Sequence, residues 1–558
     1  MIVTSESSSA SLKPPAADES INWVALTAII LGTFVSVLNN SLLNVALPKL
    51  VNVFGSTTQD IQWVLTGYML ASAVVVPMSG YMADRFGAKR IFVLALTGFT
   101  LGSLLCGFAW SASSLIAFRI IQGIFGGFIG PICMTIVYSI VPRSKIGMAL
   151  GLWGVAAMAA PAIGPTLSGY LIQYFTWRLL FFISVPVGIF AIVVSFLVLK
   201  EMPIKSNLKF DLPGCILSVL CFGSLLLALS KGQSEGWTSL YIISLLYIAF
   251  FSMCLLIWVE LGKEQPLLDF SFFKNPTFTL SLIAGSLVMV GLYGGTFLTP
   301  LYLQNVQGQS PLQTGIIMLP QSLAMALMMP ISGRLFDKIG VVPLALTGLA
   351  LMSVTTFELH LLSQYTSNHW LDAIMTVRGL GIGMCMMPLT TVGMNAVARE
   401  RVGRASSLSN VIRQVAGSLS IAVLTAIMTN QQTLINADIS SKVTVTSDAV
   451  SRFMSTMTGY FMASGMDSTY SQASAVTVLA GMIAKESLVR AIGETFMISS
   501  MPLFLCIPIV FFFIKRKKKS EAPAPAPEAP AASSAPEQNV APEKAKVQVQ
   551  TQPSLQNA

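Results

Sequence analysis

Long apolar runs alternate with short polar links along almost the whole chain. Fourteen runs are near the roughly 20 residues that a helix needs to cross a bilayer. These candidate spans lie at about 22–43, 60–79, 91–110, 114–135, 148–172, 179–199, 212–230, 239–260, 278–301, 313–332, 342–362, 371–395, 407–428 and 495–514. The pattern therefore predicts an all-α integral membrane protein with fourteen transmembrane helices.

One short link, Gly80–Arg90, has an unusually specific sequence, GYMADRFGAKR. Two spans joined by so few residues must form an antiparallel pair with a tight turn at the membrane surface, where glycine allows close backbone approach and positive φ. The link interleaves glycines with charges at Gly80, Asp84, Arg85, Gly87, Lys89 and Arg90. A plain basic turn is the alternative interpretation, but the fixed spacing favours a specialised element.

The chain contains a parallel repeat. The link returns in shortened form as Gly333–Gly340, GRLFDKIG, in which Asp337 has the same position as Asp84 in the first copy. An arginine beside glycines follows each copy within a span, at Arg119 and at Arg378. The repeat predicts two six-helix bundles, spans 1–6 and 9–14, with spans 7 and 8 inserted between them. Duplicated bundles with a site at their interface are the physical plan for alternating access.

The expected boundaries follow from this repeat. They are a disordered N-tail at 1–20, an N-terminal six-helix bundle at 21–200, an inserted helix pair with linkers at 201–276, a C-terminal six-helix bundle at 277–514 that includes an external loop at 430–493, and a basic and then disordered C-tail at 515–558. The 430–493 segment is too long and polar for a turn, so we expect an external cap or hairpin.

Composition supports a membrane protein, since 54% of the 558 residues are hydrophobic and only 10% are charged. The net charge of +9 is not a nucleic-acid signature, because the basic residues lie in short links. The seven cysteines fall inside apolar runs, without metal-ligand spacing, and are expected to be small buried hydrophobes.

The basic residues also predict the orientation. The alternate links that include Gly80–Arg90, together with Lys515–Lys519, hold 20 Lys and Arg, whereas the opposite short links hold three. Cytoplasmic links carry the excess of Lys and Arg. We therefore expect a multi-pass protein of the plasma (inner) membrane with both termini in the cytoplasm.

Three arginines fall inside spans, at positions 119, 378 and 413. A charge within the membrane is costly and is functional by default. Arg119 and Arg378 lie at similar depths in spans 4 and 12, and Arg413 lies nearer the inner face of span 13. Each is a candidate fixed positive charge that holds a substrate group or shifts a neighbour's proton affinity. The alternative is a structural arginine satisfied by backbone carbonyls.

Two further spans carry distinctive residues. Span 5 is rich in residues that bend a helix or let another helix approach, namely Gly154, Pro161, Gly164, Pro165 and Gly169. Span 1 carries the amides Asn39 and Asn40, which either bridge neighbouring helices or line a substrate path.

Taken together, these motifs resemble the major facilitator superfamily and, more closely, its fourteen-helix drug/proton antiporter branch, the EmrB/QacA type. The resemblance rests on GYMADRFGAKR, Arg119 to Gly123, Gly164-Pro165 with Gly169, Leu38 to Pro48, Trp177-Arg178 followed by Val185 to Gly188, Asp211 to Gly214, and Tyr302 to Asn305. It covers residues 22–430 and 494–514 and implies the major facilitator fold.

The resemblance implies roles residue by residue. The residues of Gly80–Arg90 named above, with Asp337 in the repeat, would form a gating latch. Arg119 and Gln122 would belong to the proton-linked span, and Gly154, Gly164, Pro165 and Gly169 to the hinge and antiporter motif. Many members carry an aspartate where this chain has Asn39, and an asparagine does not change charge with pH. We therefore expect Glu358 or Asp372 to carry the proton, with Asp84 a poorer candidate.

The resulting expectation is a proton-coupled exporter of lipophilic compounds rather than an enzyme. It needs no cofactor, because no GxxxxGK[ST] motif is present and a proton gradient would drive it. Expected partners are the lipid bilayer, lipophilic small molecules, protons and, in a two-membrane cell, a periplasmic adaptor. Expected substrate-binding residues are Asn39, Asn40, Trp153, Tyr293, Gln304, Gln321, Arg378 and Arg413. The alternatives are an uptake permease or uniporter of the same fold, and a non-transporting receptor or scaffold.

Overall fold

The computed structural model describes residues 22–142, 145–202, 204, 210–263, 265–443 and 447–513, and all regular secondary structure within these ranges is helical. The predicted tails at 1–20 and 515–558 lie outside the described residues, as do the basic link residues Arg143, Lys205 and Lys209. Fourteen helices in the described part are long and apolar enough to cross a membrane, so the predicted number of spans is confirmed.

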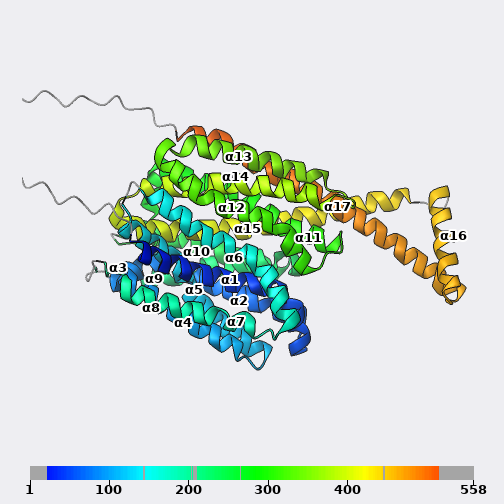
Figure 1. Cartoon of the computed structure of the whole chain (residues 1–558), viewed down its shortest axis with the longest axis horizontal. Coiled ribbons are helices and arrows are strands. Elements are labelled where there is room, and N and C mark those ends of the chain that lie inside the picture. Colours follow the sequence, from blue (N-terminus) through cyan, green and yellow to red (C-terminus); the bar gives the residue numbers. More distant parts are fainter. Residues whose placement is uncertain are drawn as a thin grey trace, which may run out of the picture. The chain divides into compact units, whose positions relative to one another are not determined.

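The first six spans form the N-terminal bundle (Figure 1). Its elements are α1 (Trp23–Phe54), α2 (Thr58–Val75), η1 (Val76–Met78), α3 (Ser79–Phe86), α4 (Ala88–Gly107), α5 (Ala112–Ile140), α6 (Ile146–Tyr174), α7 (Leu179–Phe182) and α8 (Ser184–Val198). Helix α5 packs against α2 and α4, while α1 packs against α6 and α8. Span 2 is thus built from three consecutive pieces, α2, η1 and α3, and span 6 from α7 and α8.

The inserted pair and the C-terminal bundle follow. Their elements are α9 (Leu212–Glu235), α10 (Leu240–Leu261), η3 (Phe270–Lys274), α11 (Pro276–Asn305), α12 (Pro311–Ile339), α13 (Val341–Glu358), η4 (Leu359–Leu361), α14 (Asn368–Asn395), η5 (Arg399–Arg401), α15 (Val402–Lys442), α16 (Asp448–Ala463) and α17 (Ser468–Phe511). Helix α17 packs against α11, α13 and α15, and α14 packs against α11, α12 and α13.

The inserted helices α9 and α10 pack on each other, and α9 also contacts α2 and α15. Asp211 precedes α9 and accepts a hydrogen bond from the backbone N–H of Gly214 at 2.7 Å, which caps the helix. The same carboxylate forms an ion pair with Lys263, just after α10. The ion pair therefore joins the start of α9 to the end of α10, and α9 lies between the two bundles.

In each copy of the repeated link, a glycine directly precedes the next helix. Gly87 (φ 95°) precedes α4, and Gly340 (φ 83°) precedes α13. Residues with a Cβ rarely adopt such φ values, so glycine allows the chain to reverse within one residue. Below, the latch end means the end of the helices that carries Gly80–Arg90, Gly333–Gly340 and the start of α15.

The two bundles meet closely along α6 and α12. A Cβ added at Gly151 would lie 2.7 Å from the carbonyl oxygen of Met329, and one added at Gly154 would lie 2.7 Å from the Met329 sulfur. Nearer the latch end, Gly147 and Gly333 face each other with similarly close backbones. Small residues of this kind let membrane helices approach.

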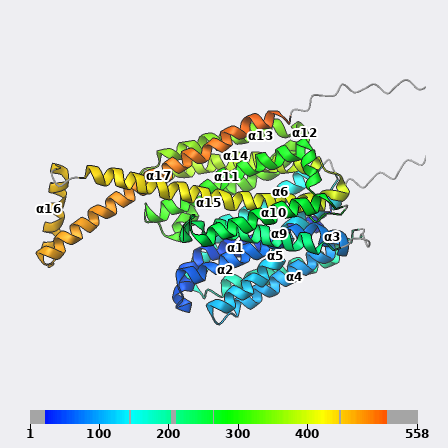
Figure 2. The same cartoon turned by 180° about the vertical axis from the view of Figure 1, so that it is seen from behind.

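Residues 430–493 are mostly helical rather than a loop. Helices α15 and α17 extend beyond the other spans, and α16 connects their far ends (Figures 1 and 2). The apolar runs at 407–428 and 495–514 therefore mark only parts of two longer helices, of 41 and 44 residues. Apolar composition indicates which part of a helix can lie in the bilayer, but it does not indicate where the helix ends.

Candidate functional site

The Arg119 side chain lies at the centre of a hydrogen-bonded network inside the N-terminal bundle. It is 0% exposed and reaches from α5 toward α1 and α2. Its Nη1 donates to Asn39 Oδ1 at 2.8 Å and to Gln122 Oε1 at 2.7 Å, and its Nη2 donates to Asn40 Oδ1 at 3.1 Å. Arg119 and Gln122 are one helical turn apart on α5, so their side chains lie on the same face of the helix and contact each other.

Backbone and aromatic groups complete the surroundings of this guanidinium. Arg119 Nε donates to the carbonyl oxygen of Val64 at 3.1 Å, and the charge lies 4.2 Å from the centre of the Tyr68 ring. The face of an aromatic ring attracts a cation. Three helices of the bundle thus hold one fixed positive charge.

Asn39 connects this charge to two more helices. Its Nδ2 donates to Ser103 Oγ on α4 and to Ser184 Oγ on α8, both at 3.1 Å. Asn39 is 1% exposed, so it faces the interior of the bundle in this conformation. Asn39 forms its other hydrogen bonds with Arg119 and Gln122. Within the described residues, no carboxylate forms a hydrogen bond or an ion pair with Arg119.

Arg378 occupies the matching place in the C-terminal bundle, but it has fewer hydrogen-bond acceptors around it in the described chain than Arg119 has. It is also 0% exposed, and it donates from Nε to Thr356 Oγ1 at 3.1 Å and from Nη2 to the carbonyl oxygen of Gly291. Its Nη1 is buried and has no hydrogen-bond partner among the described residues. The absence of a side chain at Gly295 leaves room for this guanidinium.

Arg413 lies on α15 and is only partly buried. Its Nη1 donates to Thr390 Oγ1 on α14 at 3.2 Å, and its Nη2 donates to Asn410 Oδ1 at 3.1 Å. The three intramembrane arginines thus differ: Arg119 has a full hydrogen-bonded network, Arg378 has a partial one, and Arg413 is partly exposed.

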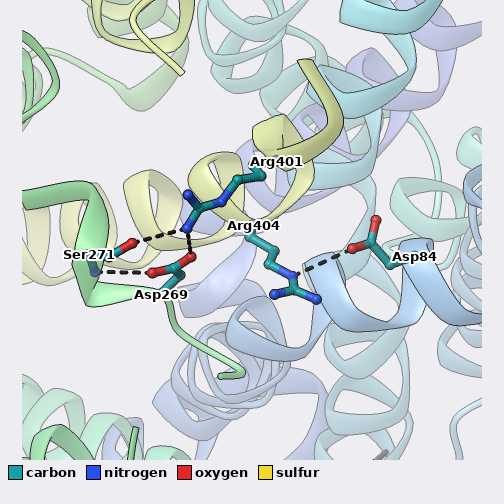
Figure 3. Close-up of polar contacts among 5 residues, drawn as sticks. All are labelled: Asp84, Asp269, Ser271, Arg401 and Arg404. Carbon is teal, nitrogen blue, oxygen red and sulfur yellow. Dashed lines mark hydrogen bonds and ion pairs between the residues drawn. The ribbon is translucent and has the colours of Figure 1, made fainter. Parts of the chain in front are cut away.

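The latch end joins the bundles through the start of α15 (Figure 3). Asp84 on α3 pairs with Arg404 at 3.4 Å, and a Cβ added at Gly80 would lie 3.0 Å from the Arg404 Cα. Beside this contact, Asp269 in the link before α11 pairs with Arg401, which also donates to Ser271 Oγ at 3.0 Å. Two neighbouring carboxylates thus hold two arginines at one helix start.

Burial opposes ionisation of Asp269, but the hydrogen bonds from Ser271 and Arg401 and the charge of Arg401 outweigh it and lower the pKa of this carboxyl. Asp269 therefore stays charged at neutral pH and holds its arginine there.

Asp337, the repeat's counterpart of Asp84, meets the other bundle in a different way. Its two carboxylate oxygens accept from the backbone N–H groups of Gly147 and Met148, both at 3.3 Å, at the start of α6. A carboxylate is favourable there because the start of a helix carries unsatisfied N–H groups and a partial positive charge. Each bundle thus places a carboxylate on a helix start of the other bundle.

The other residues of the predicted latch lie within the N-terminal bundle. Arg90 forms an ion pair with Glu201 at 3.4 Å, and the Lys89 ammonium lies 5.3 Å from the centre of the Phe196 ring. Gly87 faces the Glu201 carboxylate. Arg85 is partly buried and has no ion pair within the described part of the chain.

The glycines and proline predicted as a hinge face two different helices. Gly164 packs against Ser41 of α1, while Pro165 and Gly169 face the start of α12 near Gly315 and Leu312. Helix α6 therefore links the helix that carries Asn39 to the opposite bundle.

The predicted proton carriers are not close partners of the arginines. Glu358 ends α13 and Asp372 lies in the first turns of α14, both partly buried at the end opposite the latch. One oxygen of Asp372 is buried without a hydrogen-bond partner in the described chain. Neither acid forms a hydrogen bond or ion pair with an arginine among the described residues.

The predicted substrate residues do not form one cluster. Trp153 donates to Thr33 Oγ1 at 2.9 Å, and Tyr293 lies against Gly417. Gln321 is 2% exposed, with its Oε1 unpartnered in the described chain. Gln304 is exposed near the end of α11 and makes no hydrogen bond within the described residues, so its position in a span did not indicate burial.

The sequence did not single out several residues of these contacts. Tyr68, Ser103 and Ser184 complete the arginine network, and Arg404 and Asp269 complete the latch. The basic run at Arg399–Arg404 was a signal for the latch, because it lies at the same predicted membrane surface as Asp84. No local pattern marked the two serines.

Comparisons with known proteins agree with this architecture. The family model described as Major Facilitator Superfamily matches residues 29–421. Among solved structures, the human organic anion transporter MFSD10 (TETRAN) aligns with a TM-score of 0.58 at 14% identity, covering 89% of this chain and 100% of that chain. The proton:xylose symporter XylE aligns with a TM-score of 0.58 at 11% identity, covering 88% and 95%. These two structures support the fold alone.

Relatives in sequence are closer. The chain is 39% identical over 417 residues to the uncharacterized MFS-type transporter YhcA of Bacillus subtilis, covering 75% of this chain and 78% of the relative. It is 30% identical over 481 residues to the multidrug export protein EmrB of Escherichia coli K12, covering 85% and 91%. It is 31% identical to the multidrug resistance protein Stp of Mycobacterium tuberculosis H37Rv, covering 73% and 75%. With its fourteen spans and the length of the family match, the chain belongs to the Major Facilitator Superfamily and is a secondary transporter of the EmrB/QacA type.

Proposed function

We propose that this transporter exports lipophilic compounds by alternating access and is driven by protons that enter in exchange. Relatives named as multidrug export and resistance proteins support the export of drugs. The observation that carries the mechanism is the reciprocal latch, in which Asp84 meets the start of α15 and Asp337 meets the start of α6. Opening this end requires both contacts to break, so the latch stabilises one of two states.

The excess of Lys and Arg in the links at the latch end supports its placement on the cytoplasmic side of the plasma membrane. The described conformation would then be closed toward the cytoplasm. Substrate would be released on the outside, and the latch would re-form with each return to this state.

Protons supply enough energy for this work. Holding a thousandfold concentration gradient costs about 4.2 kcal/mol, because each tenfold step costs about 1.4 kcal/mol. One proton that enters across 100 mV releases about 2.3 kcal/mol, and each unit of pH difference adds about 1.4 kcal/mol. One or two protons per cycle therefore suffice.

The Arg119 network contains no acid among the described residues, so the proton carrier is proposed elsewhere. Glu358 and Asp372 are the proposed carriers, because both are partly buried acids on the side from which protons would enter. Arg119 would then serve as a fixed charge that orients Asn39, Asn40 and Gln122 rather than as the partner of a titrating acid.

The test uses purified protein in sealed liposomes that contain the dye rhodamine 6G. Exporter activity predicts dye movement that starts when a pH difference is imposed and stops when an uncoupler removes it. Substitution of both Glu358→Gln and Asp372→Asn should abolish the pH dependence. Dye movement that is unchanged by the uncoupler would instead identify a uniporter, and no movement of dye would overturn the proposal.

A further inference from the structure

Three carboxyl groups of the described chain are buried, and all three belong to the inserted helix pair or to the links beside it. They are Asp211, 6% exposed, Glu260, 2% exposed, and Asp269, 5% exposed. Asp211 pairs with Lys263, and Asp269 pairs with Arg401. Within the described residues no basic group pairs with Glu260, so this acid is the one buried carboxyl there without a cation.

Glu260, at the end of α10, faces a second carboxyl instead. A Cβ added at Gly214 would collide with both Glu260 Oε1 and Asp211 Oδ2, so the two oxygens approach the same point. Both oxygens of Glu260, and Oδ2 of Asp211, are buried without a hydrogen-bond partner in the described chain. The other oxygen of Asp211, Oδ1, binds Lys263 and accepts from the backbone N–H of Gly214. Asp211 therefore uses one oxygen for its cation and turns the other toward Glu260.

The charges of this group balance only if one acid holds a proton. Two facing, buried carboxylates repel each other and have both lost the water that would stabilise them. With Lys263 as the single cation, the group has one negative charge in excess when both acids are ionised, and it is neutral when one is protonated. A proton on either acid also provides a hydrogen bond between Glu260 and Asp211. Charge and hydrogen bonding thus both favour one shared proton.

The other titratable groups at this end of the inserted pair are engaged elsewhere. Helix α10 packs on α9 and on η3. In η3 and the link before it, Lys274 is exposed and Asp269 already has its arginine. On α9, the Cys215 thiol lies one turn after the start of the helix, with its sulfur 3.6 Å from that of Met78. Among the described groups, Asp211 is therefore the charged neighbour that faces Glu260.

We propose that Asp211 and Glu260 form a proton-binding site, in which the two carboxyls share one proton taken from the cytoplasm. Lys263 is partly exposed beside the site, so water reaches it from the latch end. When the proton leaves, two like charges face each other and push the start of α9 away from the end of α10. The site is separate from Glu358 and Asp372, which lie at the opposite end of the helices.

The site lies between two attachments to the latch. One is Phe210, directly before α9, whose ring packs edge-on against Tyr81 of α3 with the ring centres 5.4 Å apart. The other is Asp269 in the link after α10, which binds Arg401 near the start of α15 (Figure 3). Loss of the proton therefore acts on both sides of the ion pair between α3 and α15 and favours opening. This effect on the latch rests on the proposed function, whereas the proton site itself does not.

The proton is detected by infrared spectroscopy of the purified full-length protein in micelles, because a protonated carboxyl has a C=O band that a carboxylate lacks. In the wild type, one such band should shift in D2O and disappear as the pH is raised. Glu260→Gln should lack this band at every pH. Asp269→Asn is the matched control, because Asp269 is similarly buried but has its own arginine, so this variant should keep the band.

Lys263→Gln is a second variant, which keeps the site testable if Glu260→Gln does not fold. Lys263 is partly exposed and follows the end of α10, so its replacement leaves the packed part of the helix intact. Without this positive charge the two acids should hold their proton more tightly, and the band should disappear about one pH unit higher than in the wild type.

The effect on the latch is measured as a distance between spin labels at Ser139→Cys on α5 and Lys338→Cys on α12. Both positions are exposed near the latch end, and the exposed Cys254 is replaced by serine to prevent labelling there. The open fraction should rise about threefold when the wild type is taken from mildly acidic to alkaline pH. It should not change with pH in Glu260→Gln.

A titrating band that Glu260→Gln retains, or that Lys263→Gln leaves at the wild-type pH, would overturn the proton site. Equal pH dependence of the latch distance in wild type and Glu260→Gln would overturn the effect on the latch. Neither measurement requires transport, so failure of the liposome test would reject the export proposal and leave both of these results valid.

Discussion

The two bundles carry an arginine at the same place in the repeat, yet the two side chains have very different surroundings. Arg119 meets four oxygen acceptors and a tyrosine ring, whereas Arg378 meets two acceptors and leaves Nη1 unpartnered in the described chain. The acids of the repeat differ in the same way, since Asp84 pairs with an arginine and Asp337 with backbone N–H groups. A repeat therefore preserves position more strictly than it preserves interactions.

The largest effect should come from Arg119→Met. It leaves the oxygens of the buried Asn39 and Gln122, and of the half-buried Asn40, without their charged donor, and a lost hydrogen bond to a charged group costs about 1.5–3 kcal/mol. We expect the free energy of unfolding to fall by about 3–5 kcal/mol in total, because two buried acceptors, in Asn39 and Gln122, each lose a hydrogen bond to a charged group. Reversible denaturation in detergent micelles measures it. A loss below about 1 kcal/mol would mean that the network does not stabilise the bundle.

A second effect should follow from Asn39→Asp, which places a carboxylate beside Arg119, where the present distance is 2.8 Å. The hydroxyls of Ser103 and Ser184 can rotate to donate to this carboxylate. The carboxylate and the Arg119 guanidinium then form an ion pair with no net charge. Transport of the cationic dye rhodamine 6G, relative to that of the anionic dye fluorescein, should rise about tenfold, which corresponds to about 1.4 kcal/mol. Gln304→Glu is the control, because it adds the same charge at an exposed site, and an equal rise there would contradict a local cause.

A smaller effect is expected for Asp269→Asn at the latch. The pKa of Asp269 is lowered in the folded protein, so its pairing stabilises the fold fully above the ordinary aspartate value of about 3.9 and is lost as the pH falls through the lowered value. Because Arg401 is half exposed, we expect a loss of about 0.5–1 kcal/mol at pH 7, which vanishes once the pH is below the lowered pKa of Asp269. The measurement is the difference in unfolding free energy between variant and wild type at each pH.

Asp438→Asn is the control for that measurement, because Asp438 pairs with Lys442 on an exposed helix surface. It should change the unfolding free energy less than Asp269→Asn at every pH. Equal changes in the two variants would show that the latch pair adds no more than an ordinary surface pair.

The smallest effect should come from Arg378→Met, which sharpens the contrast with Arg119. Replacing this side chain removes a buried charge whose Nη1 has no hydrogen-bond partner in the described chain, and it leaves two acceptors of that part behind. Apolar replacements of poorly compensated buried charges are often neutral or stabilising, so we expect a change within about 1 kcal/mol. A loss as large as that of Arg119→Met would show that the two arginines are energetically equivalent after all.

The sequence predicted the parts of the molecule that depend on local pattern. Hydropathy predicted fourteen spans, and the structure has fourteen helices that are long and apolar enough to cross a membrane in its described part. The partners of Asp84 and Asp269 lie more than 130 residues away in the chain, so their pairing depends on how the bundles pack and on no local signal. Gln304 shows the reverse error, because membership of an apolar span does not determine which face a side chain takes.

The length of α15 has a mechanical consequence. Its 41 residues form one helix of about 62 Å, which begins at the two ion pairs of the latch and ends beyond the other spans, next to α16. A tilt of about 5° at its first turn would displace the distal turn by about 5 Å, if the helix stays straight. The distance between a spin label on α16 and a second label on α13 would therefore change each time the latch opens or closes.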